Sequence, residues 1–382
     1  MNNQLVIACG LALTATLCFM CERQAPPQLP VLGEPVMGGA YNPPPVRTFP
    51  SNANVINGWI NAQDFRAMRA HAWDIWQSIN TPAPDGRPIW ETWYSGHELF
   101  EMTTAAKTNR KGLLDFEFPS QFFHASVKVA GIPSDPAETP TSFNRYSPSL
   151  ASFIYEHRYY DALYLDSINS AFNQQKTPII DRQISTSTDS VDAMSFALKP
   201  VFQFISGDSA TAIPFWAGVS PYSTRNLDNP TPDTWRQCVI VDPTGKLKPG
   251  EKVKMKCNCE TEKAWPVVAL SDFYAIKITA AQEKAFSQFA ETSGDDVGAG
   301  NNSSADSIAQ MVKAGNYALL AAMHVTGKET VNWTWQTFWW SPNPYDPVFG
   351  DDRPKNLPAP WSNYNMLTAY NMVYPLTDGV SG

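Results

Sequence analysis

The chain has 382 residues, of which 43% are hydrophobic and 17% are charged. This composition is that of a globular protein with a large buried core, and it excludes a disordered or fibrous chain. The net charge is -8, and no continuous Lys/Arg run is present to neutralise successive phosphates, so we expect no nucleic-acid partner.

The amino-terminal region has the features of an export segment. An uncharged apolar run, residues 5–20, is too short for a good bilayer span and is followed at once by Cys21 and Pro-rich sequence. Cys21 is a lipidation candidate, which would attach the protein to a membrane through an N-terminal lipid anchor. An uncleaved apolar anchor is the alternative. We therefore expect an exported protein, periplasmic or a membrane-tethered lipoprotein.

Three parts follow from this interpretation. Residues 1–21 are the signal or lipoprotein-type export segment, residues 22–51 are a Pro-rich tether, and residues 52–382 form a single large domain.

The first predicted element of that domain is a helix that ends at Thr81-Pro82. Asn61 to Asp64 offers an N-cap, and apolar side chains then recur at helical spacing from Phe65 to Ile79. Residues 89–94 are rich in strand-forming residue types, and Ser95 is placed to cap a short turn that carries His97.

The middle of the chain predicts a second helix and a further strand. Residues 155–172 are compatible with one helix, and residues 267–278 with a strand. Thr279 to Gln282 has the form of a capping box that opens another helix. The apolar positions of the residue 155–172 helix fall on one side: Tyr160, Leu163, Tyr164, Ile168 and Phe172.

Near the end of the chain, residues 317–325 and 331–340 predict two strands joined by a hairpin-length turn. Helices and strands are mixed without regular alternation. The predicted fold class is therefore α+β, with a mixed or antiparallel sheet packed with several helices and with long ordered Pro-rich loops.

Cys238, Cys257 and Cys259 are the disulfide candidates of the body. Two strand-like stretches, one at Cys238 and one before Cys257, flank a turn-rich segment, so a disulfide across a hairpin is a natural arrangement. A zinc site of three thiolates is the alternative, but its fourth ligand is missing and we predict no metal. No Cys-x-x-Cys-His occurs, which excludes covalent c-type haem in this chain and leaves any other cofactor unknown.

Several segments, in the same order, resemble a group of uncharacterised exported bacterial proteins that are sometimes associated with c-type cytochromes. They are residues 73–80, residues 89–93, residues 98–100, His324 to Lys328 and residues 333–338. The resemblance implies a cytochrome system as a partner, but no known reaction. Trp339-Trp340 stands where that group has a Glu-His pair.

Trp90 and Trp93 flank Glu91, and in a strand Glu91 would lie on the same side as Trp93. A carboxylate beside an aromatic wall suits a general acid or an acceptor for sugar hydroxyls, whereas the structural alternative is an ion pair or a turn cap. Glu91, His97 and His324 are the catalytic candidates. His97-Glu98 lacks the second histidine of a metalloprotease motif.

The second aromatic segment has a cation and an imidazole beside it. Trp333 and Trp335 are two residues apart and would lie on the same face of a strand, with His324 and Lys328 on either side of the preceding turn. This pattern is typical of a platform for a sugar or an anion. The structural alternative is core packing of both rings with Lys328 exposed. The ligand-binding candidates are Trp90, Trp93, Lys328, Trp333 and Trp335.

We therefore expect an exported protein with an aromatic-lined site for a small or glycan-like ligand. An exported hydrolase or redox-linked enzyme is one alternative, and an accessory subunit of a c-type cytochrome system is another.

Overall fold

The computed structural model describes residues 52–84, 86–100, 141–142, 144–175, 195–216, 237–257, 262–284, 312–330 and 332–370. The predicted export segment, with Cys21, and the Pro-rich tether lie outside the described residues, and so does Cys259. The described part combines helices with antiparallel and mixed sheets, so the predicted α+β class is confirmed.

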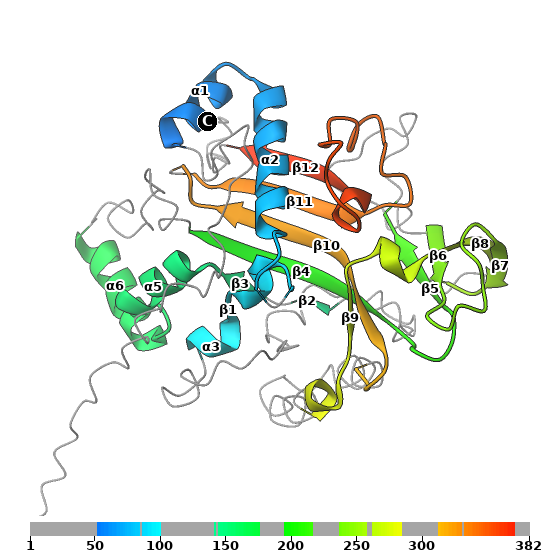
Figure 1. Cartoon of the computed structure of the whole chain (residues 1–382). Coiled ribbons are helices and arrows are strands. Elements are labelled where there is room, and N and C mark those ends of the chain that lie inside the picture. The colour runs from blue at the N-terminus through cyan, green and yellow to red at the C-terminus, as the bar shows by residue number, and fades with distance from the viewer. Residues whose placement is uncertain are drawn as a thin grey trace, which may run out of the picture.

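An eight-stranded sheet forms the centre of the part that the structure describes (Figure 1). Its strand order is β1-β3-β4-β10-β11-β12, with β2 beside β4 and β9 beside β10. The strands are β1 (Tyr94–Ser95), β2 (Thr141–Ser142), β3 (Arg145–Tyr146), β4 (Phe196–Ile205), β9 (Ala275–Lys277), β10 (Tyr317–Gly327), β11 (Thr334–Trp340) and β12 (Tyr364–Tyr370).

A smaller sheet lies at one end of the large one and has the order β5-β6-β8-β7. Its strands are β5 (Thr211–Phe215), β6 (Gln237–Val241), β7 (Lys252–Met255) and β8 (Lys263–Val268). Successive side chains of β6 serve two cores: Val239 packs with the main core, and Ile240 packs in a separate small cluster. This is why all but the first residue of the strand are buried.

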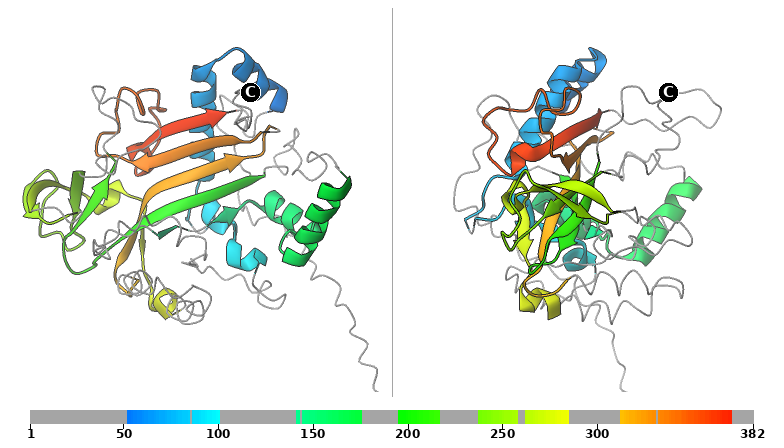
Figure 2. Two further views of the ribbon diagram at one scale, coloured as in Figure 1. Left: turned by 180° about the vertical axis from the view of Figure 1, so that it is seen from behind. Right: turned by 90° about the vertical axis from the view of Figure 1, so that its right-hand side faces the viewer.

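The helices lie mostly on one side of the large sheet or beyond its β1 end. In Figure 1, α2 crosses the front of the sheet, and in the reverse view of Figure 2 (left) β4, β10, β11 and β12 lie in front with no described helix over them. The helical segments are α1 (Ala53–Asn61), α2 (Phe65–Ile79), η1 (Ile89–Thr92), α3 (Gly96–Phe100), α5 (Pro148–Glu156), α6 (Ala162–Gln175), η7 (Leu270–Asp272) and η8 (Trp361–Asn363).

The structure confirms α2 with its predicted cap. Asp64 accepts a hydrogen bond from the backbone N–H of Ala67 at 2.9 Å, and the helix ends before Thr81. Trp76 is fully buried and stacks on Phe338 of β11, with ring centroids 4.3 Å apart. Aromatic packing of this kind holds α2 on the sheet.

The predicted hairpin is also confirmed, since β10 and β11 pair antiparallel with Gly327 opposite Thr334. Gly327 is required by close packing, because a Cβ there would lie 2.4 Å from the ring of Phe196. The capping box after β9 is present as well: Thr279 and Gln282 exchange backbone-to-side-chain hydrogen bonds of 2.9 and 3.3 Å.

The single helix predicted over residues 155–172 is wrong. α5 ends at Glu156, Arg158 has a left-handed φ of 55°, and α6 begins only at Ala162. The predicted apolar side fails with it, because Leu163 is 81% exposed. The strand predicted over residues 267–278 is likewise divided into the end of β8, η7 and β9.

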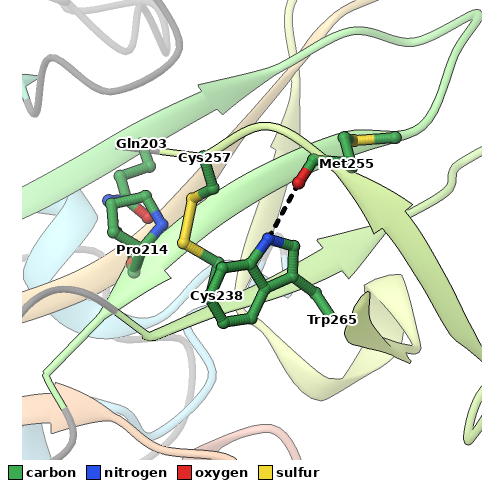
Figure 3. The surroundings of a disulfide bond; sticks show 6 residues. All are labelled: Gln203, Pro214, Cys238, Met255, Cys257 and Trp265. Atoms are coloured by element: carbon green, nitrogen blue, oxygen red, sulfur yellow. Dashed lines mark hydrogen bonds between the residues drawn. A yellow bond between two sulfur atoms is a disulfide. The ribbon is translucent and has the colours of Figure 1, made fainter. Parts of the chain in front are cut away.

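Cys238 and Cys257 form a disulfide in the small sheet, 19 residues apart in sequence (Figure 3). The two stretches are not hairpin neighbours as predicted, because β8 lies between β6 and β7: it pairs parallel with β6 and antiparallel with β7. The indole N–H of Trp265 on β8 donates a hydrogen bond to the carbonyl of Met255 at 3.0 Å. The ring of Trp265 packs in the same cluster as the disulfide. The bond also removes two of the three thiolates that a zinc site would need.

Candidate functional site

The exposed face of β11 carries Trp335. Along this strand Thr334, Gln336 and Phe338 are buried on one face, where Phe338 stacks on Trp76 of α2, whereas Trp335 is 39% exposed on the opposite face. This alternation is the predicted one from Thr334 onward. Trp333 is an exception, because its left-handed φ of 59° places it before the strand begins.

A row of side chains in register runs beside Trp335 across four strands. Lys199 of β4 lies opposite His324 of β10, His324 opposite Thr337 of β11, and Thr337 opposite Leu367 of β12. Directly opposite residues in a sheet have Cβ atoms about 5 Å apart. Trp335 is two residues from Thr337 on the same strand and therefore lies on the same face.

The imidazole of His324 is held in place and kept neutral. Its Nδ1 lies 2.9 Å from the hydroxyl of Thr337. Partial burial of the ring, and then repulsion from Lys199, lower the pKa of His324, and burial lowers the pKa of Lys199. His324 is therefore neutral at pH 7, and a neutral imidazole offers one donor and one acceptor.

Lys328 is not presented to solvent at the hairpin turn. It is 1% exposed, burial lowers its pKa, and its ammonium lies 5.2 Å from the ring centroid of Trp333. Neither the ligand-binding prediction nor its alternative of an exposed turn lysine describes this arrangement. The lysine is part of a buried cation–π contact instead.

The structure does not form the predicted ligand surface around Trp90, Glu91 and Trp93. The predicted strand is instead η1, and Trp90 and Trp93 are only 0% and 4% exposed. The indole of Trp90 donates to Asn80 at the end of α2, and Glu91 accepts a 2.5 Å hydrogen bond from the hydroxyl of Tyr274. The two rings therefore contribute to the core rather than to a surface that a ligand reaches.

The two tryptophan segments do not meet at one cavity within the described residues. Tyr94 of β1 pairs with β3, β3 pairs with β4, and β4 pairs with β10, which carries His324. Three strand spacings of about 4.8 Å place β1 about 14 Å from β10. The side chain of His97, the remaining catalytic candidate, lies outside the described residues.

A buried polar network near the hairpin was not predicted. His71 of α2 and Glu329 are both 0% exposed, and Nε2 of His71 lies 3.1 Å from the carboxylate. Nδ1 of His71 lies 2.6 Å from the hydroxyl of Tyr370, and Thr334 donates to Glu329 at 3.0 Å. No local pattern signals such a cluster, because 258 residues separate His71 from Glu329.

Trp339 and Trp340 lie at a small, almost wholly apolar pocket where β5 passes the end of β11. Trp339 packs edge-on against Trp216 at 4.7 Å, and Trp340 stacks on Phe273 at 4.1 Å. The pair that differs from the resembled group therefore packs the junction of the two sheets.

Comparisons with protein-family models, with curated proteins and with solved structures gave no match. The described residues contain no group of three or more His, Cys, Asp or Glu side chains arranged to hold a metal ion. No helix in the described ranges has the length and apolar character needed to cross a bilayer.

Proposed function

We propose that the protein binds a glycan, or another small ligand rich in hydroxyl groups, on the exposed face of the large sheet. The observation that carries the proposal is the exposed ring of Trp335 beside the row of Lys199, His324 and Thr337. An indole presents a flat apolar surface on which a sugar ring packs, and neighbouring donors and acceptors orient its hydroxyls.

The side chains of the face match this ligand class. Neutral His324 and Thr337 each donate and accept hydrogen bonds, and Lys199 adds a positively charged group beside them. Nε2 of His324 and the indole N–H of Trp335 have no hydrogen-bond partner among the described residues. The arrangement favours binding over catalysis, because Glu91 is bonded to Tyr274 on the helix side of the sheet whereas His324 lies on the exposed face.

Two features support an exported protein. The apolar run before Cys21 has the form of an export segment, and the disulfide between Cys238 and Cys257 is a bond that persists in oxidising compartments. Fractionation of labelled cells tests this part of the proposal. We expect a processed form that partitions into detergent, and a full-length product in the cytoplasm would contradict it.

Replacement of Trp335 by Ala tests the binding face. Calorimetric titration of the wild-type chain with cello-, chito- and malto-oligosaccharides and with soluble peptidoglycan fragments should show binding to one class. We expect Trp335→Ala to weaken that binding about tenfold or more, because stacking and its buried area are lost. The melting temperature should change little, since the ring is partly exposed.

Tyr345→Ala is the matched control, because Tyr345 is 81% exposed and lies in the loop after β11 rather than on the sheet face. This variant should bind as the wild type does. Wild-type affinity retained by a folded Trp335→Ala variant would overturn the proposal, and so would the absence of binding to every oligosaccharide.

A further inference from the structure

The small sheet carries a cluster of lysines that forms no run in the sequence because apolar and turn residues separate them. Residues 246–256 contain five lysines and one glutamate, in a chain whose net charge is -8. Lys263 follows on β8. All six lysines are exposed: Lys246, Lys248, Lys252, Lys254, Lys256 and Lys263.

Because side chains alternate between the two faces of a strand, the lysines of β7 lie on the face opposite the core. Lys252 and Lys254 on β7 point away from the sheet's interior, and Lys256 continues the same spacing, whereas Val253 and Met255 pack on the small core. Charges two residues apart along a strand are about 6.7 Å apart. The row is therefore a regular array of cations.

Protection of an edge strand explains only part of the cluster. β7 is the last strand of its sheet, and lysines on an edge strand discourage pairing with other chains. Lys246 and Lys248, however, lie in the loop before β7, and Lys263 lies on the neighbouring strand β8, opposite Met255 of β7. Only Lys252 and Lys254 lie within β7 itself, so four of the six lysines are outside the edge strand.

The cluster lies at a rigid tip. β7 and β8 are at the end of the molecule farthest from α5 and α6 (Figures 1 and 2). The disulfide joins Cys257, the second residue after β7, to Cys238 on β6, and the indole of Trp265 hydrogen-bonds to the carbonyl of Met255 on β7 (Figure 3). The lysines are therefore displayed on a fixed surface.

Acidic groups nearby reduce the local charge without cancelling it. Asp208 interacts electrostatically with Lys246, and Glu251 and Glu262 are exposed near β7. Asp242 is occupied by the turn itself, since it accepts hydrogen bonds from the backbone N–H groups of Thr244 and Leu247. Lysines remain in excess.

We propose that this tip contacts an anionic phospholipid surface. No arginine occurs between residues 237 and 284, so the cations are the strongly hydrated point charges suited to diffuse attraction rather than to the paired hydrogen bonds of phosphate-specific recognition. The cluster covers a strand, a loop and a neighbouring strand at a projecting tip, which fits a flat layer of headgroups. Trp265 is buried, so it is not exposed for base stacking.

Co-sedimentation with vesicles tests the proposal on the full chain. The test variant is Lys252→Glu/Lys254→Glu/Lys256→Glu, and the matched control reverses three exposed lysines elsewhere, Lys284, Lys313 and Lys355. Vesicles of equal parts phosphatidylglycerol and phosphatidylcholine should bind the test variant at least about tenfold more weakly than the control. Binding should also fall at 1 M salt, where the screening length is about 3 Å.

Several results would overturn the inference. Equal binding of the test and control variants to the anionic vesicles would show that the position of the lysines is irrelevant. If the wild type bound pure phosphatidylcholine vesicles as well as the anionic ones, the charge of the lipid would be irrelevant. Binding to soluble polyphosphate without binding to vesicles would assign the tip to a polymer instead. A Lys→Gln version of the test variant, with a wild-type melting temperature, separates loss of charge from loss of fold.

Discussion

At the scale of single residues, Asp352 joins the loop after β11 to α2. Its carboxylate accepts hydrogen bonds from the guanidinium of Arg69 at 2.5 and 2.7 Å and from the indole N–H of Trp73 at 2.9 Å. Burial alone would raise the pKa of Asp352, but the hydrogen bonds from Arg69 and Trp73 outweigh it and lower the pKa. The folded state therefore favours the ionised carboxylate.

We predict that Asp352→Asn lowers the free energy of unfolding by about 1 kcal/mol at pH 7, a value kept small because the pair is partly exposed. An aspartate whose pKa is lowered by folding stabilises the protein above the pH at which a free aspartate titrates, about pH 4, and loses that effect as the pH falls further. The difference between wild type and variant should thus shrink in urea titrations below about pH 4. A difference that is constant from pH 7 to pH 3 would contradict the prediction.

At the scale of elements, the buried pair of His71 and Glu329 links α2 to the turn between β10 and β11. Both side chains are fully buried, and burial, then the charge of Glu329, raise the pKa of Tyr370 well above its usual value. Removing one partner of a buried pair leaves the other without compensation for its lost hydration.

Glu329→Gln should therefore lower the free energy of unfolding by about 3 kcal/mol. Chemical denaturation gives the value, and Glu283→Gln serves as the control because Glu283 is only half-buried, in the helix after β9. A double variant with His71→Leu should lose less than the sum of the single losses. Strict additivity would show that the two side chains do not interact.

The same elements show how much of the fold could be predicted. α2 and the β10–β11 hairpin were predictable, because a capping residue and an apolar period act within one segment. Residues 89–94 were not, because their strand-forming residue types are overridden by tertiary packing, against Asn80 ten residues away and against Tyr274, which is 183 residues from Glu91. Continuous helical periodicity likewise gave no sign of the left-handed residue at Arg158.

The candidate site was predictable only where the strand period was enough. Trp335 and His324 could be placed on one hairpin, and the structure places both on its exposed face. Lys199 could not be assigned to that face, since pairing of β4 with β10 joins residues 125 positions apart. The burial of Trp90, Trp93 and Lys328 depends on long-range packing in the same way.

At the scale of the whole molecule, the main core and the core of the small sheet differ greatly in size among the described residues. The main core includes α2 and the long strands, whereas on the outer side of the small sheet the described residues form a buried cluster of six around the disulfide. Small cores rarely supply enough burial to be stable alone and often depend on disulfides. The small sheet therefore relies on the bond between Cys238 and Cys257, and on the contact of Val239 and Val241 with the main core.

Replacing both cysteines, in Cys238→Ala/Cys257→Ala, should destabilise the small sheet by about 3 kcal/mol, the value expected for a closed loop of 19 residues. Hydrogen exchange should then show faster exchange in β7 and β8 and unchanged protection in β10 and β11, because the large core does not contain the bond. Reductant should reproduce this pattern of faster exchange in the wild type. The Cys259→Ala variant is the control, and its exchange rates should equal those of the untreated wild type. Uniform loss of protection across both sheets would instead show that the two cores unfold as one unit. The small sheet that carries the exposed lysines would then not unfold independently of the large sheet.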